Sequence, residues 1–351
     1  MKTEVCYTPG LPTLTALRRW FKGNKETRFL VIFDRKLKSQ GNFSKWVRQF
    51  SFRYGVQAGE KLKEVEQFSH HVHRLNRLIY AIPTKSLVVV AVGGGSVGDF
   101  AGFFASVYKR GVGLIHLSST WLAAIDSAHG GKTALNLAGA KNQIGTFYPA
   151  QVVVLCRNLL ATQPPSLHAS AYAELFKIAA ISGGLLYRQT VGLSNLTTNS
   201  LWTVLPKAVA AKQKIVTSDP HEKKGSRQIL NLGHTFGHAL EAVYGIPHGT
   251  AVALGIKFSL QWGVSRGTTT KACCKEVVEH LNQRLEIDKL EKQLRKKKRP
   301  SIMILKRLLQ RDKKLAKGNK VSFVFLDQIG KVRREQVKVE MILKEIRRQG
   351  W

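Results

Sequence analysis

The chain has 351 residues, 44% of them hydrophobic, which is enough for two globular domains with cores of their own. No apolar run reaches the length of a membrane span, the first residues hold no hydrophobic signal region, and the four cysteines are irregularly spaced, so we expect a reduced cytoplasmic protein. The 56 Lys and Arg against 22 Asp and Glu give a net charge of +34, which predicts attraction to phosphorylated metabolites, nucleotide cofactors or nucleic acid.

The first half of the chain alternates short apolar runs with helix-like segments. The runs at 28–33, 86–92, 113–117 and 151–155 are rich in β-branched residues, which is typical of strands in a parallel sheet covered on both faces. We therefore expect a Rossmann-like α/β domain over residues 1–162. Beyond this point apolar residues recur at helical spacing, apart from a strand-like run at 321–325. This pattern predicts a mostly α-helical second domain over residues 163–351.

A glycine-rich turn, Val92–Asp99, follows the second of these runs and precedes a helix-like segment. Glycines let a backbone approach a phosphate closely, and a helix N-terminus offers free N–H groups, so this context favours a dinucleotide pyrophosphate. Many strand–turn–helix joints use glycine for packing alone, which is the competing interpretation. The spacing differs from GxGxxG, so an ordinary Rossmann dehydrogenase is disfavoured.

The segment after the third run is a second candidate for anion binding. Its Gly130–Thr133 portion resembles the end of a P-loop, but the upstream glycine of that motif is absent and ATP binding is disfavoured. Lys132, Lys141 and Asn142 suit a phosphorylated or carboxylated substrate instead. In so basic a chain a lysine is most often plain surface charge, although apolar and glycine-rich neighbours argue against a simple solvated face here.

Three histidines lie close together in the second half. His234 and His238 are four residues apart in a helix-like segment, so they share a face, and His248 follows a short turn that contains glycine and proline. This spacing suggests a metal site, although such pairs also occur on ordinary polar helix faces. The best acidic ligand is Glu174, because a carboxylate inside an apolar helix needs a partner. Two histidines and one glutamate would leave a coordination position open.

The densest basic run is Arg295–Arg299. Such a run is usually solvated surface, and no interleaved aromatic pattern accompanies it that would stack on bases. We therefore expect nucleic acid to bind only by non-specific association with the basic charge.

Several motifs follow one another over about residues 28–330: Gly93–Gly102, Tyr108–Gly111, Asp126–Thr133, Gly139–Gly145, Ala173–Lys177, Arg227–Glu241, His248–Gly249 and Asp312–Lys314. Through them the chain resembles the 3-dehydroquinate synthases, sugar-phosphate cyclases of the shikimate pathway. The resemblance implies a cytoplasmic lyase that uses NAD and Zn2+, with Co2+ as another metal for the same ligands, and that forms a homodimer. It implies conversion of 3-deoxy-D-arabino-heptulosonate 7-phosphate to 3-dehydroquinate and phosphate, through transient oxidation by NAD, phosphate elimination, re-reduction and intramolecular aldol closure.

The resemblance also implies a role for each matching residue, and it replaces the three-histidine interpretation with metal ligands Glu174, His234 and His248. It assigns His238 to proton relay near the substrate. The implied catalytic residues are Lys132, Asn142, Arg227, His238 and Glu222. The implied substrate-binding residues are Arg110, Asp126, Lys177, Lys212, Asn231 and Lys313. The implied NAD contacts are Asp34, Glu60, Lys63, Gly94, Gly95, Asp99, Ser119, Thr120, Lys141 and Thr162.

The sequence departs from the family pattern in a few places. Ser118–Thr120 stands where the family has Pro-Thr-Thr, His129 replaces a small apolar residue, and Thr250 replaces an acid after the last metal histidine. One extra residue precedes Arg227. No implied ligand or substrate-binding charge is lost.

Three alternatives compete with this interpretation. A related cyclase would act on another sugar phosphate, but Arg227, Asn231 and His238 together suit a substrate that carries a carboxylate. A metal-dependent polyol or glycerol-phosphate dehydrogenase would accumulate NADH, which a cyclase would not. A basic nucleic-acid-associated protein would bind DNA in a salt-sensitive way without metal or turnover.

Overall fold

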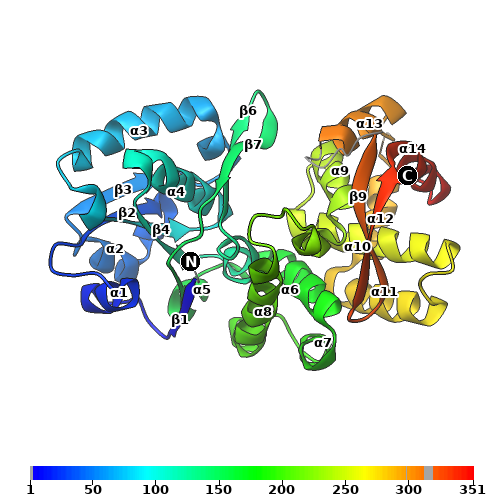
Figure 1. Ribbon diagram of the computed structural model, residues 1–351. Helices are drawn as coiled ribbons and strands as arrows, with labels where there is room; N and C mark the ends of the chain where they lie inside the picture. The colour runs from blue at the N-terminus through cyan, green and yellow to red at the C-terminus, as the bar shows by residue number, and fades with distance from the viewer. Residues whose placement is uncertain (1–2, 298, 312–318) are drawn as a thin grey trace. The chain divides into compact units, whose positions relative to one another are not determined.

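The computed structural model describes residues 3–297, 299–311 and 319–351, and the chain divides into two compact units, Met1–Pro164 and Pro165–Trp351 (Figure 1). Among the described residues, no helix is both long enough and apolar enough to cross a membrane.

The first unit is built on a six-stranded sheet of order β1-β8-β5-β4-β2-β3, in which every pairing is parallel. The strands are β1 (Glu4–Thr8), β2 (Arg28–Asp34), β3 (Phe52–Val56), β4 (Leu87–Gly93), β5 (Gly113–Ser118) and β8 (Val152–Cys156). The four expected strands are confirmed as β2, β4, β5 and β8. The sequence did not predict β1 and β3, because these two edge strands bury few side chains and carry only a weak apolar signal.

Helices cover both faces of this sheet, as expected for a parallel α/β domain. On one face, alternate strand residues such as Val31 and Val90 pack with Leu17, Phe43 and Trp46 of the covering helices. Figure 1 shows α1 and α2 on this side and α3 and α4 on the other. The helices of the unit are α1 (Leu14–Phe21), α2 (Gly41–Val47), α3 (Val65–Ile79), α4 (Gly95–Val107) and α5 (Arg157–Leu160).

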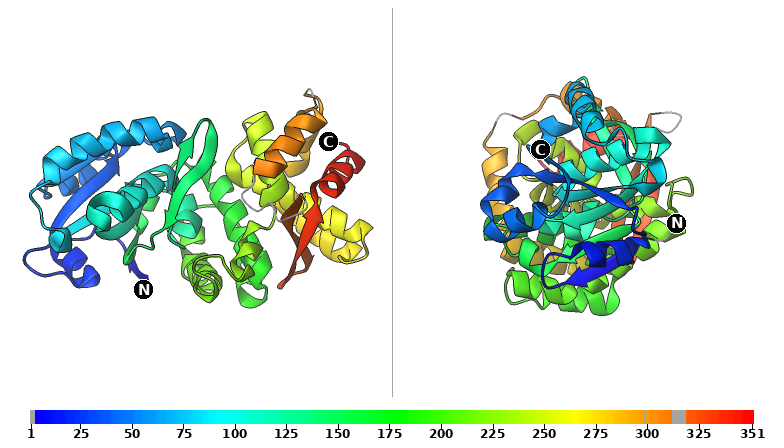
Figure 2. Two further views of the ribbon diagram at one scale, coloured as in Figure 1. Left: turned by 45° about the horizontal axis from the view of Figure 1, so that its top comes forward. Right: turned by 90° about the vertical axis from the view of Figure 1, so that its left-hand side faces the viewer.

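A second, two-stranded sheet was not expected. β6 (Lys132–Leu137) and β7 (Ala140–Phe147) pair antiparallel, and β6 lies against α4 (Figure 2). Ala138 and Gly139, both with positive φ, make the tight turn between the strands, so the glycine there marks a hairpin. Lys132 begins a strand rather than a helix, which agrees with the absence of a P-loop. Lys132 and Lys141 are both exposed on this hairpin.

The second unit is mostly helical, as the sequence predicted. Its helices are α6 (His168–Ser182), α7 (Gly184–Val191), α8 (Thr198–Ser218), α9 (His234–Tyr244), α10 (His248–Ser265), α11 (Lys271–Leu285), α12 (Ile287–Arg295), α13 (Ile302–Arg311) and α14 (Val339–Arg348). The expected strand at 321–325 is confirmed within β9 (Lys320–Gln328). Its antiparallel partner β10 (Lys331–Lys338) was not predicted, because its sequence KVRREQVK has only two apolar residues.

Glycines set how closely α6, α9 and α10 approach one another. A Cβ atom on Gly249 would lie 2.1 Å from the carbonyl oxygen of Ser170 in α6, and one on Gly255 would lie 1.8 Å from that of Gly233. The Gly249 amide also donates to Ser170 Oγ at 3.0 Å. Backbone contact of this kind leaves no room for any side chain, so the start of α10 is held directly against α6.

We expect Gly249→Ala to destabilise the fold by about 2–3 kcal/mol, because the added methyl group must push α10 away from the α6 backbone. The measurement is the urea midpoint of unfolding, with Gly41→Ala as the control. Gly41 is an exposed helical glycine whose Cβ would meet nothing within 4 Å. Equal midpoints for the two variants would show that the α6–α10 contact is not tight.

Candidate metal centre and cofactor site

Glu174 is the most deeply buried acid of the second unit. It lies in the middle of α6 with no exposed surface, as its apolar surroundings in the sequence suggested. Lys177, one turn along the helix and 1% exposed, forms an ion pair with Oε2 at 2.5 Å. The other oxygen, Oε1, accepts no hydrogen bond from the residues that the structure describes. Burial alone would raise the pKa of Glu174, but Lys177 and His248 outweigh it and lower the pKa, so the carboxylate is charged.

Two imidazole nitrogens face this unsatisfied oxygen. His234 is the first residue of α9 and His248 the first of α10, and their Nε2 atoms lie 3.6 and 3.4 Å from Glu174 Oε1. His238, one turn after His234, is exposed, and one ring nitrogen of each of the three histidines lies within 4.8 Å of the others. The structure therefore brings together all four residues that the sequence singled out for a metal.

The electrostatics differ between the two histidines beside Glu174. Burial and then the nearby Lys177 ammonium lower the pKa of His234 well below its usual value, so its ring is neutral. Its Nδ1 lies 3.2 Å from the Leu232 carbonyl oxygen, to which it can donate, and Nε2 then carries the lone pair. Burial opposes protonation of His248 as well, but its contacts with Glu174 and Glu241 raise its pKa to about 10.

These residues fit a divalent cation. A carboxylate oxygen and a neutral imidazole nitrogen that face each other across 3.6 Å repel, unless a positive charge lies between them. In a tetrahedral site with ligand bonds of 2.0–2.2 Å, neighbouring ligand atoms are about 3.4 Å apart, which is the separation found here. Nitrogen and oxygen donors of this kind suit zinc or cobalt alike.

Sequence reasoning missed Glu241. This residue lies on the last turn of α9, and its Oε2 is 2.9 Å from His248 Nδ1. An Nδ1–H that donates to a carboxylate fixes the ring and turns Nε2 toward the ligand position. Glu241 supplies this carboxylate from α9, whereas Thr250 stands where the resemblance implies an acid. The place of Glu241 seven residues after His234, on the same helical face, is the signal that could have revealed it.

Three cations assigned to the substrate are buried in this unit. Lys177 lies on α6, Lys212 on α8 and Arg227 on the turn Ser226–Asn231, with exposures of 1, 5 and 5%. That turn contacts both α6 and α8. Asn231 ends the turn and is half-buried, and Lys313 lies outside the described residues.

A loop held by Asp219 places Arg227 and carries Glu222. The buried Asp219 carboxylate accepts from the Lys224 amide at 3.1 Å and from the Arg227 amide at 3.5 Å, while the Arg227 guanidinium donates to the Pro220 carbonyl at 2.8 Å. Glu222 is half-buried and has a positive φ of 56°. Sequence reasoning did not single out Asp219, whose role depends on backbone contacts within the loop.

In the first unit, the glycine turn has the expected strand–turn–helix geometry. β4 ends at Gly93 and α4 begins at Gly95, so the free N–H groups of α4 point to the end of β4. A small pocket here is lined by Gly94, Gly95, Asp99, Lys132 and His116. His116 was not predicted, and burial lowers its pKa to about 4, so this ring is neutral at physiological pH.

Three of the predicted residues meet around a fourth, the buried Lys63. Lys63 Nζ lies 2.7 Å from Asp99 Oδ2 and 3.5 Å from Glu60 Oε1, and it donates to Asn142 Oδ1 at 2.5 Å. The Asn142 amide in turn donates to Asn136 Oδ1, so the tip of the hairpin is tied to this cluster. Ser119 and Thr120 follow β5 directly, where the Ser119 amide donates to the Gly93 carbonyl.

Of the other predicted residues of this unit, Asp34 lies at the same sheet edge as the glycine turn, because Phe33 pairs with Val92 on the neighbouring strand, whereas Arg110 and Thr162 lie elsewhere. Arg110 follows the far end of α4, about 20 Å along the helix from the glycine turn at 1.5 Å per residue. Thr162 is exposed and borders a different pocket, beside Gly10 and Leu11. Asp34 ends β2 and caps the following turn through the Lys36 amide, and Asp126 lies in a single π-helical turn.

Two sequence models of one family match consecutive parts of the chain. The sequence model described as "3-dehydroquinate synthase N-terminal" matches residues 53–170, and "3-dehydroquinate synthase C-terminal" matches residues 171–315. The chain belongs to the 3-dehydroquinate synthase family.

Individual relatives support the family. A 3-dehydroquinate synthase from Lactiplantibacillus plantarum is 41% identical over 210 residues, which are 57% of this chain and 56% of the relative. A bifunctional shikimate kinase/3-dehydroquinate synthase from Thermotoga maritima is 33% identical over 278 residues, 78% of this chain and 54% of the relative. The chain thus spans little more than half the length of these two relatives.

A solved structure shares the fold. A 2-deoxy-scyllo-inosose synthase, determined in complex with carbaglucose-6-phosphate, NAD+ and Co2+, superposes with a TM-score of 0.81 at 24% identity, covering 98% of this chain and 96% of that one.

We expect Glu241→Gln to weaken divalent-metal binding about 10- to 100-fold, because the neutral amide stabilises the His248 ring less than a carboxylate does. The measurement is Co2+ affinity from the visible absorption spectrum. Glu279→Gln is the control, since Glu279 is exposed on α11 of the same unit. Unchanged affinity in Glu241→Gln would mean that His248 needs no carboxylate partner.

Proposed function

We propose that this protein is a 3-dehydroquinate synthase, which converts 3-deoxy-D-arabino-heptulosonate 7-phosphate to 3-dehydroquinate and phosphate. Family membership supports the proposal, and the observation that carries it is the buried Glu174 carboxylate with two histidine Nε2 atoms 3.4 and 3.6 Å from one oxygen. Such an enzyme is a lyase of aromatic amino-acid biosynthesis.

Two groups complete the proposal. Glu174, His234 and His248 would hold a divalent metal, and the glycine turn with Glu60, Lys63 and Asp99 would hold NAD. When bound, NAD takes up and returns a hydride, and the metal polarises a substrate oxygen as a Lewis acid. The free N–H groups at the start of α4 suit the cofactor's pyrophosphate. NAD and a metal are present in the 2-deoxy-scyllo-inosose synthase structure that shares this fold.

The buried cations give the second unit its selectivity for an anionic substrate. Lys177, Lys212 and Arg227 are each at most 5% exposed, so their charges act in a medium of low dielectric constant where pairing with phosphate and carboxylate is strong. Arg227 would neutralise a carboxylate or phosphate of the substrate, and Asn231 would donate to it. Lys132 and Asn142 keep the catalytic roles that the resemblance implies. The buried cations suit a substrate that carries both phosphate and carboxylate.

Proton transfer is assigned to His238. It is exposed, and its ring centre lies 5.1 Å from that of His234. Histidine is the side chain most often used for general acid–base catalysis. Glu222 is a second acid for the same purpose. The substrate contacts at Arg110, Asp126 and Lys313, the cofactor contacts at Asp34, Ser119, Thr120, Lys141 and Thr162, and the homodimer stay predictions from the resemblance.

The test is phosphate release from 3-deoxy-D-arabino-heptulosonate 7-phosphate by the purified chain. We expect release that needs both NAD and a divalent metal, that stops with a chelator and that leaves no net NADH. Accumulation of NADH would point to a dehydrogenase. No release from folded, metal-loaded protein would point to a different sugar phosphate.

We expect Glu174→Gln to lose bound metal and to slow phosphate release by at least about 100-fold, because a neutral amide is a poor metal ligand and leaves Lys177 without its counter-charge. Metal content and turnover are measured on the same preparation. Glu66→Gln, an exposed acid on α3, is the control. Full activity of the metal-replete Gln variant would rule out Glu174 as a ligand.

A further inference from the structure

The segment Gln349–Trp351 is held in a fixed path after α14. The Trp351 amide donates to the Ile346 carbonyl at 3.0 Å and the Gly350 amide to the Arg347 carbonyl at 2.9 Å, which together form a Schellman motif. Gly350 has a φ of +85°, and a Cβ there would lie 2.3 Å from an Arg295 nitrogen. The positive φ favours glycine here, and the missing side chain leaves room for the Arg295 guanidinium.

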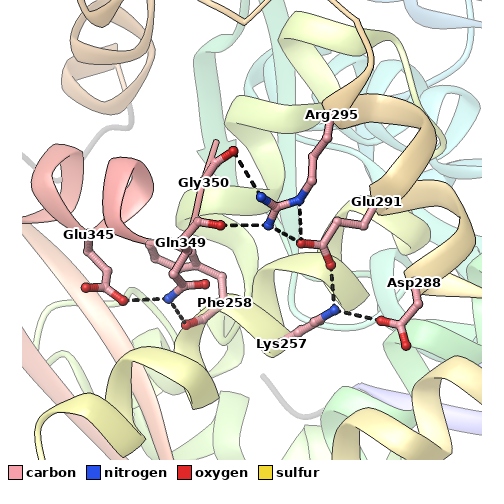
Figure 3. Close-up of polar contacts among 8 residues, drawn as sticks. All are labelled: Lys257, Phe258, Asp288, Glu291, Arg295, Glu345, Gln349 and Gly350. Carbon is pink, nitrogen blue, oxygen red and sulfur yellow. Dashed lines mark hydrogen bonds and ion pairs between the residues drawn. The ribbon is translucent and has the colours of Figure 1, made fainter.

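Arg295, the last residue of α12, clamps this segment from the other side (Figure 3). Its guanidinium donates to the carbonyl oxygens of Gly350 at 3.0 Å and Gln349 at 2.7 Å. The Gln349 side chain donates to the Phe258 carbonyl of α10 at 3.1 Å. The segment is therefore held by α12 through its backbone and by α10 through the Gln349 side chain.

An acidic cluster orients the clamp. Glu291, 8% exposed, accepts from Arg295 Nε at 2.9 Å, and its other oxygen pairs with Lys257 Nζ at 2.5 Å (Figure 3). Lys257 also pairs with Asp288 at 2.6 Å. Because Glu291 keeps Lys257 as a partner, a change at Arg295 would not leave a buried carboxylate unpaired.

The indole of Trp351 reaches the histidine helix. Trp351 is 6% exposed, the Arg295 guanidinium lies 4.9 Å from its ring centre, and its ring meets Phe236 edge-on at 5.4 Å. Phe236 stacks on Phe258 of α10 at 4.3 Å. Trp351 thus packs against the side of α9 on which Phe236 contacts Phe258 of α10.

Phe236 lies between the two histidines of α9 in sequence but on the opposite face. At 100° per residue, it is about 160° around the helix axis from both His234 and His238. A side chain that presses on Phe236 therefore supports α9 from behind while the histidines point the other way. A rotation or retreat of α9 would move His234 away from Glu174.

We propose that Trp351 is a positioning residue, which fixes the orientation of α9 and so presents His234 to Glu174 for metal binding. The inference rests on the metal role of His234 proposed above. Trp351 touches neither metal nor substrate, and it acts through Phe236.

The test compares wild type, Trp351→Ala, Trp351→Phe and Arg295→Gln in the purified full chain after metal removal. Met341→Ala is the matched control, because Met341 is a 50% exposed apolar residue on α14. Two quantities are measured: Co2+ affinity from the visible spectrum, and hydrogen exchange of the α9 amides in the metal-free protein.

In Trp351→Ala we expect about 10-fold weaker Co2+ binding and faster exchange in α9, with α6 and the first unit unchanged. Trp351→Phe should restore most of both, and Arg295→Gln should shift both in the same direction by less, which keeps the test valid if Trp351→Ala does not fold. Met341→Ala should match wild type.

Wild-type affinity and wild-type α9 exchange in a folded Trp351→Ala variant would overturn the inference. Equal loss of protection throughout the second unit would also overturn it, because Trp351 would then only stabilise the fold. If the wild type itself binds no Co2+, the proposed metal site fails, and the exchange of α9 alone decides whether Trp351 positions that helix.

Discussion

The buried carboxylate of Glu174 is the constraint on which the second unit depends. A charge with no exposed surface costs several kcal/mol unless partners compensate for it, and removal of a single partner is expensive. Lys177 compensates one oxygen from within α6. The other oxygen faces imidazoles that only α9 and α10 can supply, so three helices must converge on one atom. The glycines at their crossings, Glu241 behind His248 and Trp351 behind α9 all serve this convergence.

Close approach of the helices matters because the ligating side chains are short. Glutamate and histidine reach only a few ångströms from the helix surface, and metal ligands must lie within 2.0–2.2 Å of the ion. Gly249 and Gly255 let backbones touch, which removes the side-chain layer that normally separates helices by 8–10 Å. At this crossing, direct backbone contact between α6 and the start of α10 replaces the usual layer of interdigitated side chains. Such contacts tolerate no added atom.

Features that depend on a local sequence pattern could be predicted from the sequence. Continuous apolar runs identified β2, β4, β5 and β8, and an acid among apolar residues identified Glu174, because both signals lie within one element. The edge strands β1 and β3 were not predicted, because half-exposed strands mix polar and apolar residues. The hairpin β6–β7 was not predicted either, because Gly130 and Gly131 just before β6 resemble part of an anion-binding loop.

Long-range contacts account for the rest of what was missed. Trp351 and Phe236 are far apart in the sequence, and Glu241 and His248 belong to different helices that a turn folds together. Helical periodicity gives the buried face of α9 but not the residue that covers it. The family resemblance can reveal a long-range contact only where its motifs include both of the residues in contact. Glu241 lies inside a motif without an assigned role, and Trp351 lies outside every motif.

The net charge of +34 affects the association of the protein with other molecules and does not determine its fold. Among the described residues, the buried charges are balanced: Lys63, Lys177, Lys212 and Arg227 against Glu174, Asp219, Glu291 and Glu345. Among the described residues, the positive excess therefore lies outside the buried interior. On the surface it produces a field that raises the encounter rate of any anion and weakens as salt increases. The proposed function therefore assigns selectivity for one anion to the buried cations, since the surface field attracts polyanions as readily as a small phosphorylated substrate.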